Sequence, residues 1–264
     1  MLADYHVHTA FSDDSEYQME ACVKRAIQIG LDELCFTEHI DYGVKTDLNC
    51  NIHDYIEEYK RCKDIYSDRI TLRFGIEFGM QVGTVERFQQ DFDAYPFDFV
   101  ILSCHQVDNK EFWNQDFQKG KTQKEYNEKY YEEILKVINL YHDYSVLGHL
   151  DMIKRYDEKG DYSSPKVKDI IADILKVVIA DDKGIEINTS SHRYGLNDLT
   201  PSRDILTLYK ELGGKIVTIG SDSHKEGHLG AYIEYTKEEL KKLGFKVYCT
   251  YANMKPIYHS LYDE

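Results

Sequence analysis

Two histidines, His6 and His8, stand one residue apart near the start of the sequence. If this segment is extended, their side chains and that of Asp4 point to one face of a strand. Asp13 and Asp14 follow after a predicted turn. Because neutral imidazole and carboxylate are common ligands of zinc, iron and manganese, the segment is a candidate part of a metal site. A His-x-His pair alone is more often an ordinary polar strand end, so the rest of the chain must decide.

Other metal-capable residues recur directly after short apolar runs, which are typical of buried parallel strands. Glu77 ends the run 70–77, and His105 follows the run 97–104. Each such residue alone is more often a core residue than a ligand, so the joint pattern carries the prediction. In a parallel α/β barrel the carboxyl ends of the strands converge on one face, where active sites form. We therefore expect one cluster formed by Glu77, Asp222 and six of the eleven histidines, namely His6, His8, His39, His105, His149 and His224.

Strand patterns alternate with helical patterns along the whole chain. Apolar stripes with helical spacing occur within 19–27, 52–59, 84–94, 126–141, 167–178 and 205–212. Units of about 30 residues match the length of a βα repeat. We therefore predict an α/β barrel of seven such units, formed by a single domain that spans residues 1–264.

Polar caps and prolines predict where five helices begin. The residues that mark these starts are Asn51, the Thr122–Glu125 pair, Ser164-Pro165, Thr200-Pro201 and the Thr236–Glu239 pair. The stretch 245–251 predicts a terminal strand, whose place in the fold stays open.

Composition narrows the classes of partner. The 264 residues carry a formal net charge of -15, which argues against a nucleic-acid-binding surface or an anchor to an anionic membrane. A locally positive site still permits an anionic substrate. The six cysteines form no Cys-x-x-Cys pair, and neither a signal peptide nor a membrane span is recognised. We expect a cytoplasmic protein with reduced thiols, without nucleic-acid or membrane partners, and leave its oligomeric state open.

Eight short motifs follow one another in a fixed order from residue 2 to about residue 231. They are Asp4-Tyr-His6-Val-His8-Thr, Phe11-Ser-Asp-Asp14-Ser, Phe36-Thr-Glu-His39, Gly75-Ile-Glu77, Ser103-Cys-His105, Gly148-His149-Leu-Asp151, Glu186-Ile-Asn188 and Ser221-Asp222-Ser-His224. The ordered set resembles the polymerase and histidinol phosphatase (PHP) superfamily, and within it the chain is most similar to the stand-alone histidinol-phosphate phosphatases. The resemblance implies a distorted (βα)7 barrel with a metal site at the carboxyl ends of its strands.

The resemblance also implies three metal positions, filled by two to three divalent ions of zinc, manganese or iron. The first would be held by His6, His8, Glu77 and Asp222, and the second by Glu77, His105 and His149. The third would be held by His39, His224 and a residue of the turn 12–14. Many relatives carry a histidine at this last point, where the present chain has Asp14, and Asp13 stays an alternative.

The implied chemistry is hydrolysis of a phosphate ester. Metal coordination lowers the pKa of bound water from 15.7 toward about 7, so the expected nucleophile is a hydroxide that bridges two metals. Asp222, Glu77 and His224 are the candidate catalytic residues, and either Asp222 or a nearby histidine would protonate the leaving group. Arg155 and Arg193 are expected to bind phosphate oxygens, unless they are solvated loop arginines.

Weaker candidates surround these residues. Lys154 and His192 are possible neighbours of the phosphate, and Asp41, Asp151 and Glu38 are unranked candidates for the imidazole and ammonium of a substrate.

The function that the resemblance implies is hydrolysis of L-histidinol phosphate to L-histidinol and phosphate, in histidine biosynthesis. One alternative keeps the site but uses another small phosphate ester, a nucleotide or a nucleic-acid end. Another alternative is a metal-binding regulatory or storage protein without turnover, which would leave the two arginines unexplained.

Overall fold

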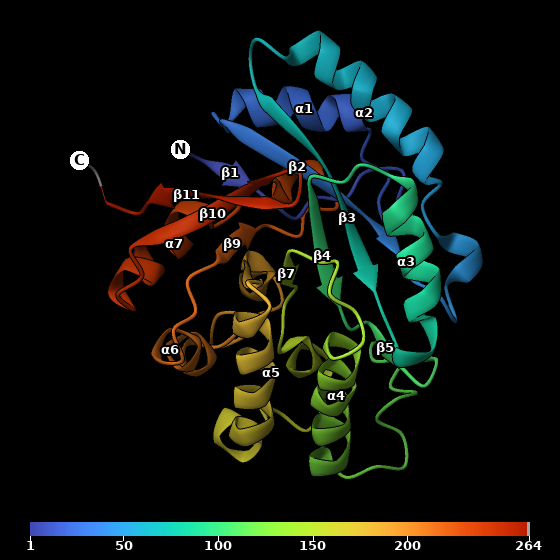
Figure 1. Cartoon of the computed structure of the whole chain (residues 1–264), viewed down its shortest axis with the longest axis vertical. Coiled ribbons are helices and arrows are strands. Elements are labelled where there is room, and N and C mark those ends of the chain that lie inside the picture. Colours follow the sequence, from blue (N-terminus) through green and yellow to red (C-terminus); the bar gives the residue numbers. More distant parts are fainter. Residues whose placement is uncertain (263–264) are drawn as a thin grey trace.

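The computed structural model describes residues 1–262, except the side chain of Ser164. In it, seven parallel strands curl into a nearly closed barrel (Figure 1). The strands are β1 (Ala3–Asp4), β2 (Glu33–Ile40), β3 (Thr71–Gly79), β4 (Phe99–Ser103), β7 (Val146–Leu147), β8 (Gly184–Asn188) and β9 (Val217–Gly220). Their order in the sheet follows their order in the chain. The predicted seven-stranded barrel is therefore confirmed.

The barrel closes through the segments that follow β1 and β9. The backbone N–H of Tyr5 donates to the carbonyl of Ile219 at 3.1 Å, and the N–H of His8 donates to the carbonyl of Ser223 at 2.8 Å. The N–H of Ser223 in turn donates to the carbonyl of His6 at 3.2 Å. These hydrogen bonds place the first and the last of the sequence motifs side by side.

Seven α-helices in the described residues cover the outside of the barrel, and most of them bury the apolar stripe that predicts them. They are α1 (Met19–Gln28), α2 (Ile52–Tyr66), α3 (Val85–Ala94), α4 (Gln123–Ile138), α5 (Lys168–Ala180), α6 (Arg203–Glu211) and α7 (Ile233–Lys242). Short 3-10 helices lie at Thr46–Leu48, Val82–Thr84, Met152–Tyr156, Ser164–Val167, Thr189–His192 and Glu226–His228. None of the helices in the described residues is long and apolar enough to cross a membrane.

Two of the five predicted helix starts are confirmed. The Asn51 side chain accepts hydrogen bonds from the backbone N–H groups of His53 and Asp54 at the start of α2. Thr122 and Glu125 form the predicted reciprocal capping box at the start of α4. Both satisfy N–H groups that the first turn of a helix leaves without partners.

The other three predicted starts are displaced from the observed ones. Thr236 and Glu239 lie inside α7, which begins at the buried Ile233, and Glu239 pairs with Arg203 instead. Packing of Ile233 into the core therefore extends this helix by about one turn toward the amino end. Ser164-Pro165 begins a 3-10 turn, after which α5 starts at Lys168, and Thr200-Pro201 precedes α6.

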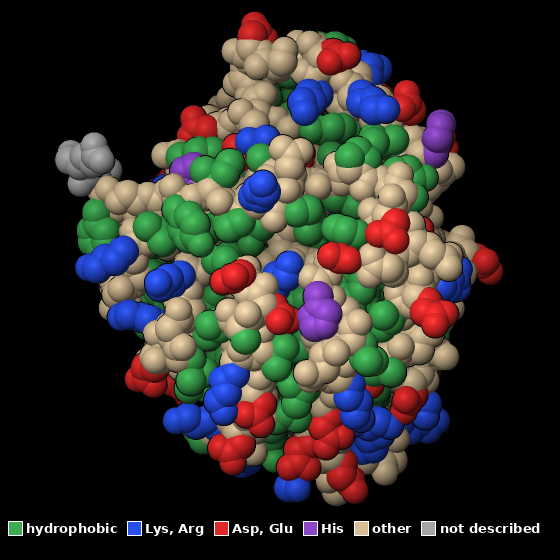
Figure 2. All heavy atoms as spheres, viewed as in Figure 1, with side chains coloured by type: hydrophobic (Ala, Val, Ile, Leu, Met, Phe, Trp, Pro, Cys, Tyr) green, Lys and Arg blue, Asp and Glu red, His purple; other side chains and the backbone are tan. Residues whose placement is uncertain are grey.

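The terminal strand belongs to a hairpin that covers the amino ends of the barrel strands. β10 (Val247–Ala252) pairs antiparallel with β11 (Lys255–Ser260), and neither joins the barrel sheet. Tyr251 packs on Phe99, which packs on Tyr5, with 5.0 Å between ring centroids in each pair. Ile257 and Tyr258 of β11 are exposed. Figure 2 shows apolar groups at this edge of the molecule. The hairpin thus seals the end of the barrel opposite to the predicted site.

A short hairpin also follows β4. It consists of β5 (Gln106–Val107) and β6 (Lys110–Glu111), and the turns after it lead through Trp113 to α4. This segment supplies one wall of the pocket described below.

Candidate metal centre

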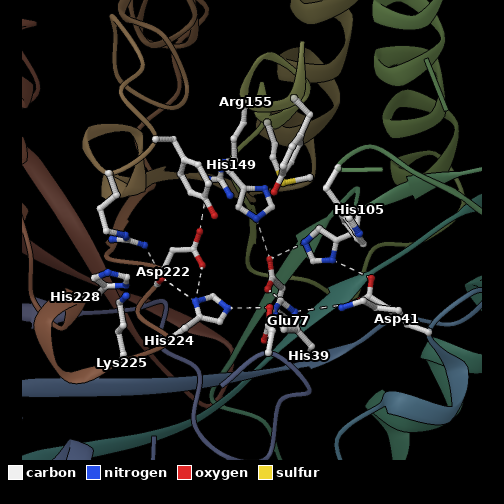
Figure 3. Close-up of a pocket in the computed structure, with 17 residues that line it drawn as sticks. His39, Asp41, Glu77, His105, His149, Arg155, Asp222, His224, Lys225 and His228 are labelled. Atoms are coloured by element: carbon white, nitrogen blue, oxygen red, sulfur yellow. Dashed lines mark hydrogen bonds and ion pairs between the residues drawn. The ribbon is translucent and has the colours of Figure 1, made fainter. Parts of the chain in front are cut away.

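All eight residues of the predicted cluster lie together at the carboxyl ends of the barrel strands. Figure 3 shows the members that line the pocket, namely His39, Glu77, His105, His149, Asp222 and His224. Strand register explains part of this arrangement, because His39 on β2 is the direct neighbour of Glu77 on β3. His105 and His149 follow β4 and β7, which are the next strands around the barrel. His6 and His8 are brought to Asp222 and His224 by the pairing that closes the barrel.

Glu77 is the centre of the cluster, and its fully buried carboxylate contacts five imidazoles. Oε1 lies 3.0 Å from Nε2 of His149 and 3.2 Å from Nε2 of His105. Oε2 lies 3.0 Å from Nδ1 of His39, 3.2 Å from Nε2 of His6 and 3.5 Å from Nε2 of His8. A carboxylate that faces ring nitrogens through both oxygens can bridge two cations, as the resemblance implies for Glu77.

Asp222 completes a second group of donors with His6 and His8. Its Oδ1 lies 3.8 Å from Nε2 of each histidine and 3.6 Å from Nδ1 of His224. Asp222 has a positive φ of 54°, which is uncommon for a residue other than glycine. The surrounding contacts therefore hold this carboxylate in a strained backbone conformation.

A third group lies at the more open side of the cluster. Oδ2 of Asp14 is 3.2 Å from Nε2 of His224 and 3.5 Å from Nε2 of His39. Asp13 instead points to Lys45, with Oδ2 2.8 Å from Nζ. The geometry therefore favours Asp14 over Asp13 as the acidic member of this group.

Three buried side chains fix the orientation of the central donors. Glu186 on β8 lies 2.5 Å from Nδ1 of His6, and Asp41 lies 2.8 Å from Nδ1 of His105. The hydroxyl of Ser103 donates to Oε1 of Glu77 at 2.6 Å. Asp41 also lines the pocket, so of the three acidic candidates for substrate binding it alone is placed beside the site.

The electrostatics of the cluster favour positive charge at its centre. Burial raises the pKa of Glu77, but His6, His105 and His39 outweigh it and hold the pKa well below its ordinary value. Burial lowers the pKa of His6, but Glu186, Glu77 and Asp222 raise it well above the ordinary value. In the metal-free protein, protons on imidazoles thus supply the charge that bound cations would otherwise supply.

The cluster opens into a pocket of about 640 Å³ whose rim is rich in cationic side chains. These are Arg155, Arg193, Lys45 and Lys225. The neutral ring of His228 lines the pocket as well. Nη2 of Arg155 lies 3.5 Å from Oδ2 of Asp222 and donates to Oγ of Ser190 at 2.6 Å. Asp14, Asp41, Glu77 and Asp222 line the same pocket, so the cationic side chains offset these carboxylates and provide hydrogen-bond donors for an anionic ligand.

Several weaker candidates are engaged elsewhere. Glu38 is buried and accepts from the backbone and hydroxyl of Thr9 and from the hydroxyl of Ser12. Asp151 accepts from Nζ of Lys154 at 2.7 Å, so these two residues pair with each other outside the pocket. His192 stacks on Tyr232, with 4.2 Å between ring centroids, and also lies outside the pocket.

The sequence reasoning missed Lys225, His228 and Trp113. Lys225 follows His224 directly, so its place in the chain was a usable signal. Trp113 lies in a segment of turns without apolar periodicity, so no pattern in the sequence indicated that it reaches the pocket.

The donor set fits divalent transition metals. Nε2 of His6, Nε2 of His8, Nδ1 of His39 and Oε2 of Glu77 are buried and make no hydrogen bond within the described residues. The donor atoms form four overlapping groups of three, each with all atoms within 4.8 Å of one another. Imidazole and carboxylate donors that converge without hydrogen bonds are the arrangement expected of ligands to zinc, manganese or iron.

A parallel barrel that gathers such donors beside two arginines has the architecture of a metal-dependent hydrolase. The model of the PHP domain family matches residues 4–190. The chain belongs to this family.

The chain is similar to proteins named as histidinol-phosphatases along nearly its whole length. The histidinol-phosphatase of Lactococcus lactis subsp. lactis is 34% identical over 259 residues, which cover 96% of this chain and 95% of that protein. A probable histidinol-phosphatase of Clostridium acetobutylicum is 31% identical, with 98% of this chain and 96% of that protein covered. The chain is also similar to a crystal structure of histidinol phosphate phosphatase from Lactococcus lactis subsp. lactis in complex with zinc, L-histidinol and phosphate. The two structures superpose with a TM-score of 0.89 at 33% sequence identity, and the match covers 97% of this chain and 98% of that chain.

Proposed function

We propose that this protein is a metal-dependent phosphomonoesterase that hydrolyses L-histidinol phosphate to L-histidinol and phosphate. The observation that carries the proposal is the position of Arg155 and Arg193 in the wall of the same pocket as the donor cluster. A storage protein would need the donors but not the arginines. The likeness to a phosphatase whose crystal structure contains zinc, L-histidinol and phosphate supports the substrate. We take residues 1–264 as one domain, of which 263–264 lie outside the described residues.

We assign three metal positions to the cluster. The first uses His6, His8, Glu77 and Asp222, the second uses Glu77, His105 and His149, and the third uses His39, His224 and Asp14. Divalent ions bound there supply Lewis acidity and lower the pKa of coordinated water. Zinc is the first choice because the similar crystal structure contains it, with manganese and iron as alternatives.

The arginines bind the phosphoryl group, because a planar guanidinium donates two parallel hydrogen bonds to phosphate oxygens. Nη2 of Arg155 donates to Ser190, but its Nε makes no hydrogen bond within the described residues. Arg193 instead donates through Nη1 and Nη2 to the backbone carbonyls of Ser221 and Asp222, at 2.7 Å each. We therefore assign Arg155 mainly to substrate binding, and Arg193 both to substrate binding and to support of Asp222.

The leaving alkoxide needs a proton, and the charges in the pocket narrow its source. Burial raises the pKa of Asp222, but His6, His224 and Arg155 outweigh it and lower the pKa, so this carboxylate is ionised and suits a ligand better than a proton donor. Burial together with Arg193 and Lys225 lowers the pKa of His228 to about 4, so its ring is neutral at pH 7. Both groups are therefore poor proton donors at pH 7.

The test is release of phosphate from a panel of esters by protein loaded with zinc, manganese or iron. We expect L-histidinol phosphate to have the highest kcat/KM and a chelator to abolish turnover. Faster turnover of a nucleotide or of a sugar phosphate would overturn the substrate assignment. Absence of turnover with every metal would overturn the enzyme assignment.

A further inference from the structure

The strand motif Glu186-Ile-Asn188 has no part in the mechanism above, yet it places a carboxylate inside the donor cluster. Glu186 lies on β8, is completely buried and does not line the pocket. It therefore has no access to a substrate. Both of its oxygens nevertheless contact residues assigned to metal positions, through Nδ1 of His6 at 2.5 Å and the backbone N–H of His149 at 2.8 Å. Figure 3 shows His149 on the far side of Glu77 from His39 and His224.

We propose that Glu186 is a positioning residue that couples two metal positions, by fixing the tautomer of His6 and the backbone of His149. This inference rests on the metal centre in the proposed function. It needs neither the arginines nor the identity of the substrate.

The contact with His6 determines which ring nitrogen is free. A carboxylate can only accept, so the short contact with Nδ1 requires that Nδ1 carries the proton. Nε2 is then unprotonated and can bind a cation together with Glu77 and Asp222, whose oxygens lie 3.2 Å and 3.8 Å away. Carboxylates that accept from the second nitrogen of a ligating histidine orient the ring and strengthen its metal bond.

The contact with His149 acts on the backbone. His149 has a positive φ of 22°, outside the conformations that residues other than glycine ordinarily adopt. The hydrogen bond from its N–H to Oε2 of Glu186 anchors this conformation, which directs Nε2 of the ring to Oε1 of Glu77 at 3.0 Å. One buried carboxylate thus supports ligands assigned to two different ions.

Packing on β9 leaves room for this arrangement only because residue 220 is glycine. A Cβ atom at Gly220 would lie 2.6 Å from Oε1 of Glu186 and 2.3 Å from Cβ of His6. Any side chain at this position would displace Glu186 or His6 from the observed place.

Glu186→Gln tests the proposal, because glutamine keeps the shape but offers one acceptor oxygen instead of two. It cannot accept from both His6 and His149. We expect the zinc affinity of the two positions that use these histidines to fall about 10- to 100-fold, measured by chelator competition and by metal content after dialysis. Zinc at the position of His39, His224 and Asp14 should remain.

Glu33→Gln is the matched control. Glu33 is also a buried strand glutamate, but it lies at the opposite end of the barrel, where it pairs with Arg73 and Tyr5. Its variant should bind zinc as the wild type does. A folded Glu186→Gln protein with wild-type zinc affinity would overturn the proposal.

A measurement on the wild-type protein covers the case in which Glu186→Gln fails to fold. Nitrogen-15 chemical shifts of labelled histidine, with the His6 signal assigned by its loss in His6→Gln, should show a proton on Nδ1 of His6 in zinc-loaded protein. A proton on Nε2 would overturn the proposal. If the wild-type protein binds zinc but hydrolyses no ester, the proposed function is overturned and the role of Glu186 stands. If the wild-type protein binds no divalent metal, both the proposed function and the role of Glu186 are overturned.

Discussion

Oδ2 of Asp14 lies 3.2 Å from Nε2 of His224, whereas the neighbouring Asp13 pairs with Nζ of Lys45 at 2.8 Å. Two adjacent aspartates in one turn therefore have different partners. The sequence left both open as the acidic ligand of the third metal position. The structure places Asp14 beside two histidines of that position, His224 and His39.

Asp14→Asn should remove one metal ion per chain. An amide is a weaker ligand for a transition metal than a carboxylate, and the remaining histidines offer too few donors. We expect the metal content to fall by one ion and kcat to fall at least about 10-fold, measured by elemental analysis and phosphate release. Asp13→Asn is the control. It removes only the ion pair with Lys45 near the surface, which contributes at most about 1 kcal/mol to the free energy of unfolding. Loss of the ion in Asp13→Asn instead would contradict the assignment.

Arg155→Ala and Arg193→Ala should differ in their kinetics. Removal of a charge-assisted hydrogen bond costs about 1.5–3 kcal/mol, so Arg155→Ala should raise KM for the ester about 10- to 100-fold. Arg193→Ala should also lower kcat, because Arg193 holds the backbone carbonyls of Ser221 and Asp222. Steady-state kinetics and the inhibition constant of inorganic phosphate measure the two effects. Unchanged kinetics in both variants would refute their role in phosphate binding.

Much of the fold and of the donor cluster could be predicted because it follows from short-range patterns. Apolar runs indicated the strands, and a residue at the carboxyl end of a parallel strand must lie near the other strand ends. The sequence therefore predicts that His39, Glu77, His105 and His149 lie on one face of the barrel. The order of the strands in the sheet then follows the order of the chain.

The parts that could not be predicted depend on contacts between distant segments. Glu186 and His6 are 180 positions apart, and Arg193 and Ser221 are 28 apart. The orientation of Asp14 depends on the turn that Ser12 stabilises through its hydroxyl bond to Glu38. No local pattern encodes these pairs. The false capping box at Thr236 failed for the same reason, since the packing of Ile233 decides where α7 begins.

Trp113 gives a direct signal for binding in the pocket. It is the single tryptophan of the chain, is 39% exposed and lines the pocket, with Nζ of Lys45 5.4 Å from its ring centroid. We expect L-histidinol or phosphate to change its fluorescence in a saturable manner in metal-loaded protein. Trp113→Phe should abolish this signal and leave the fold intact. Unchanged emission at ligand concentrations that inhibit turnover would show that ligands bind away from this wall.

The stability of the metal-free protein should fall as pH rises. Burial lowers the pKa of His105, but Asp41 and Glu77 outweigh it and raise it from 6.5 to about 9. A raised pKa in the folded state means that the proton stabilises the fold. The proton on His105 contributes up to about 3 kcal/mol to the free energy of unfolding. This contribution is complete below about pH 6.5 and is lost as pH rises toward 9.

Bound zinc should reverse this trend, because metal and proton compete for the same imidazoles. Urea unfolding of chelator-treated protein should give a free energy of unfolding that decreases between about pH 6.5 and 9. The stabilisation gained on adding zinc should increase over the same range. His105→Gln should remove part of the pH dependence in the metal-free protein, since it deletes one of the titrating groups. Metal-free protein that is more stable at pH 9 than at pH 6.5 would show that protons do not replace cations in this cluster.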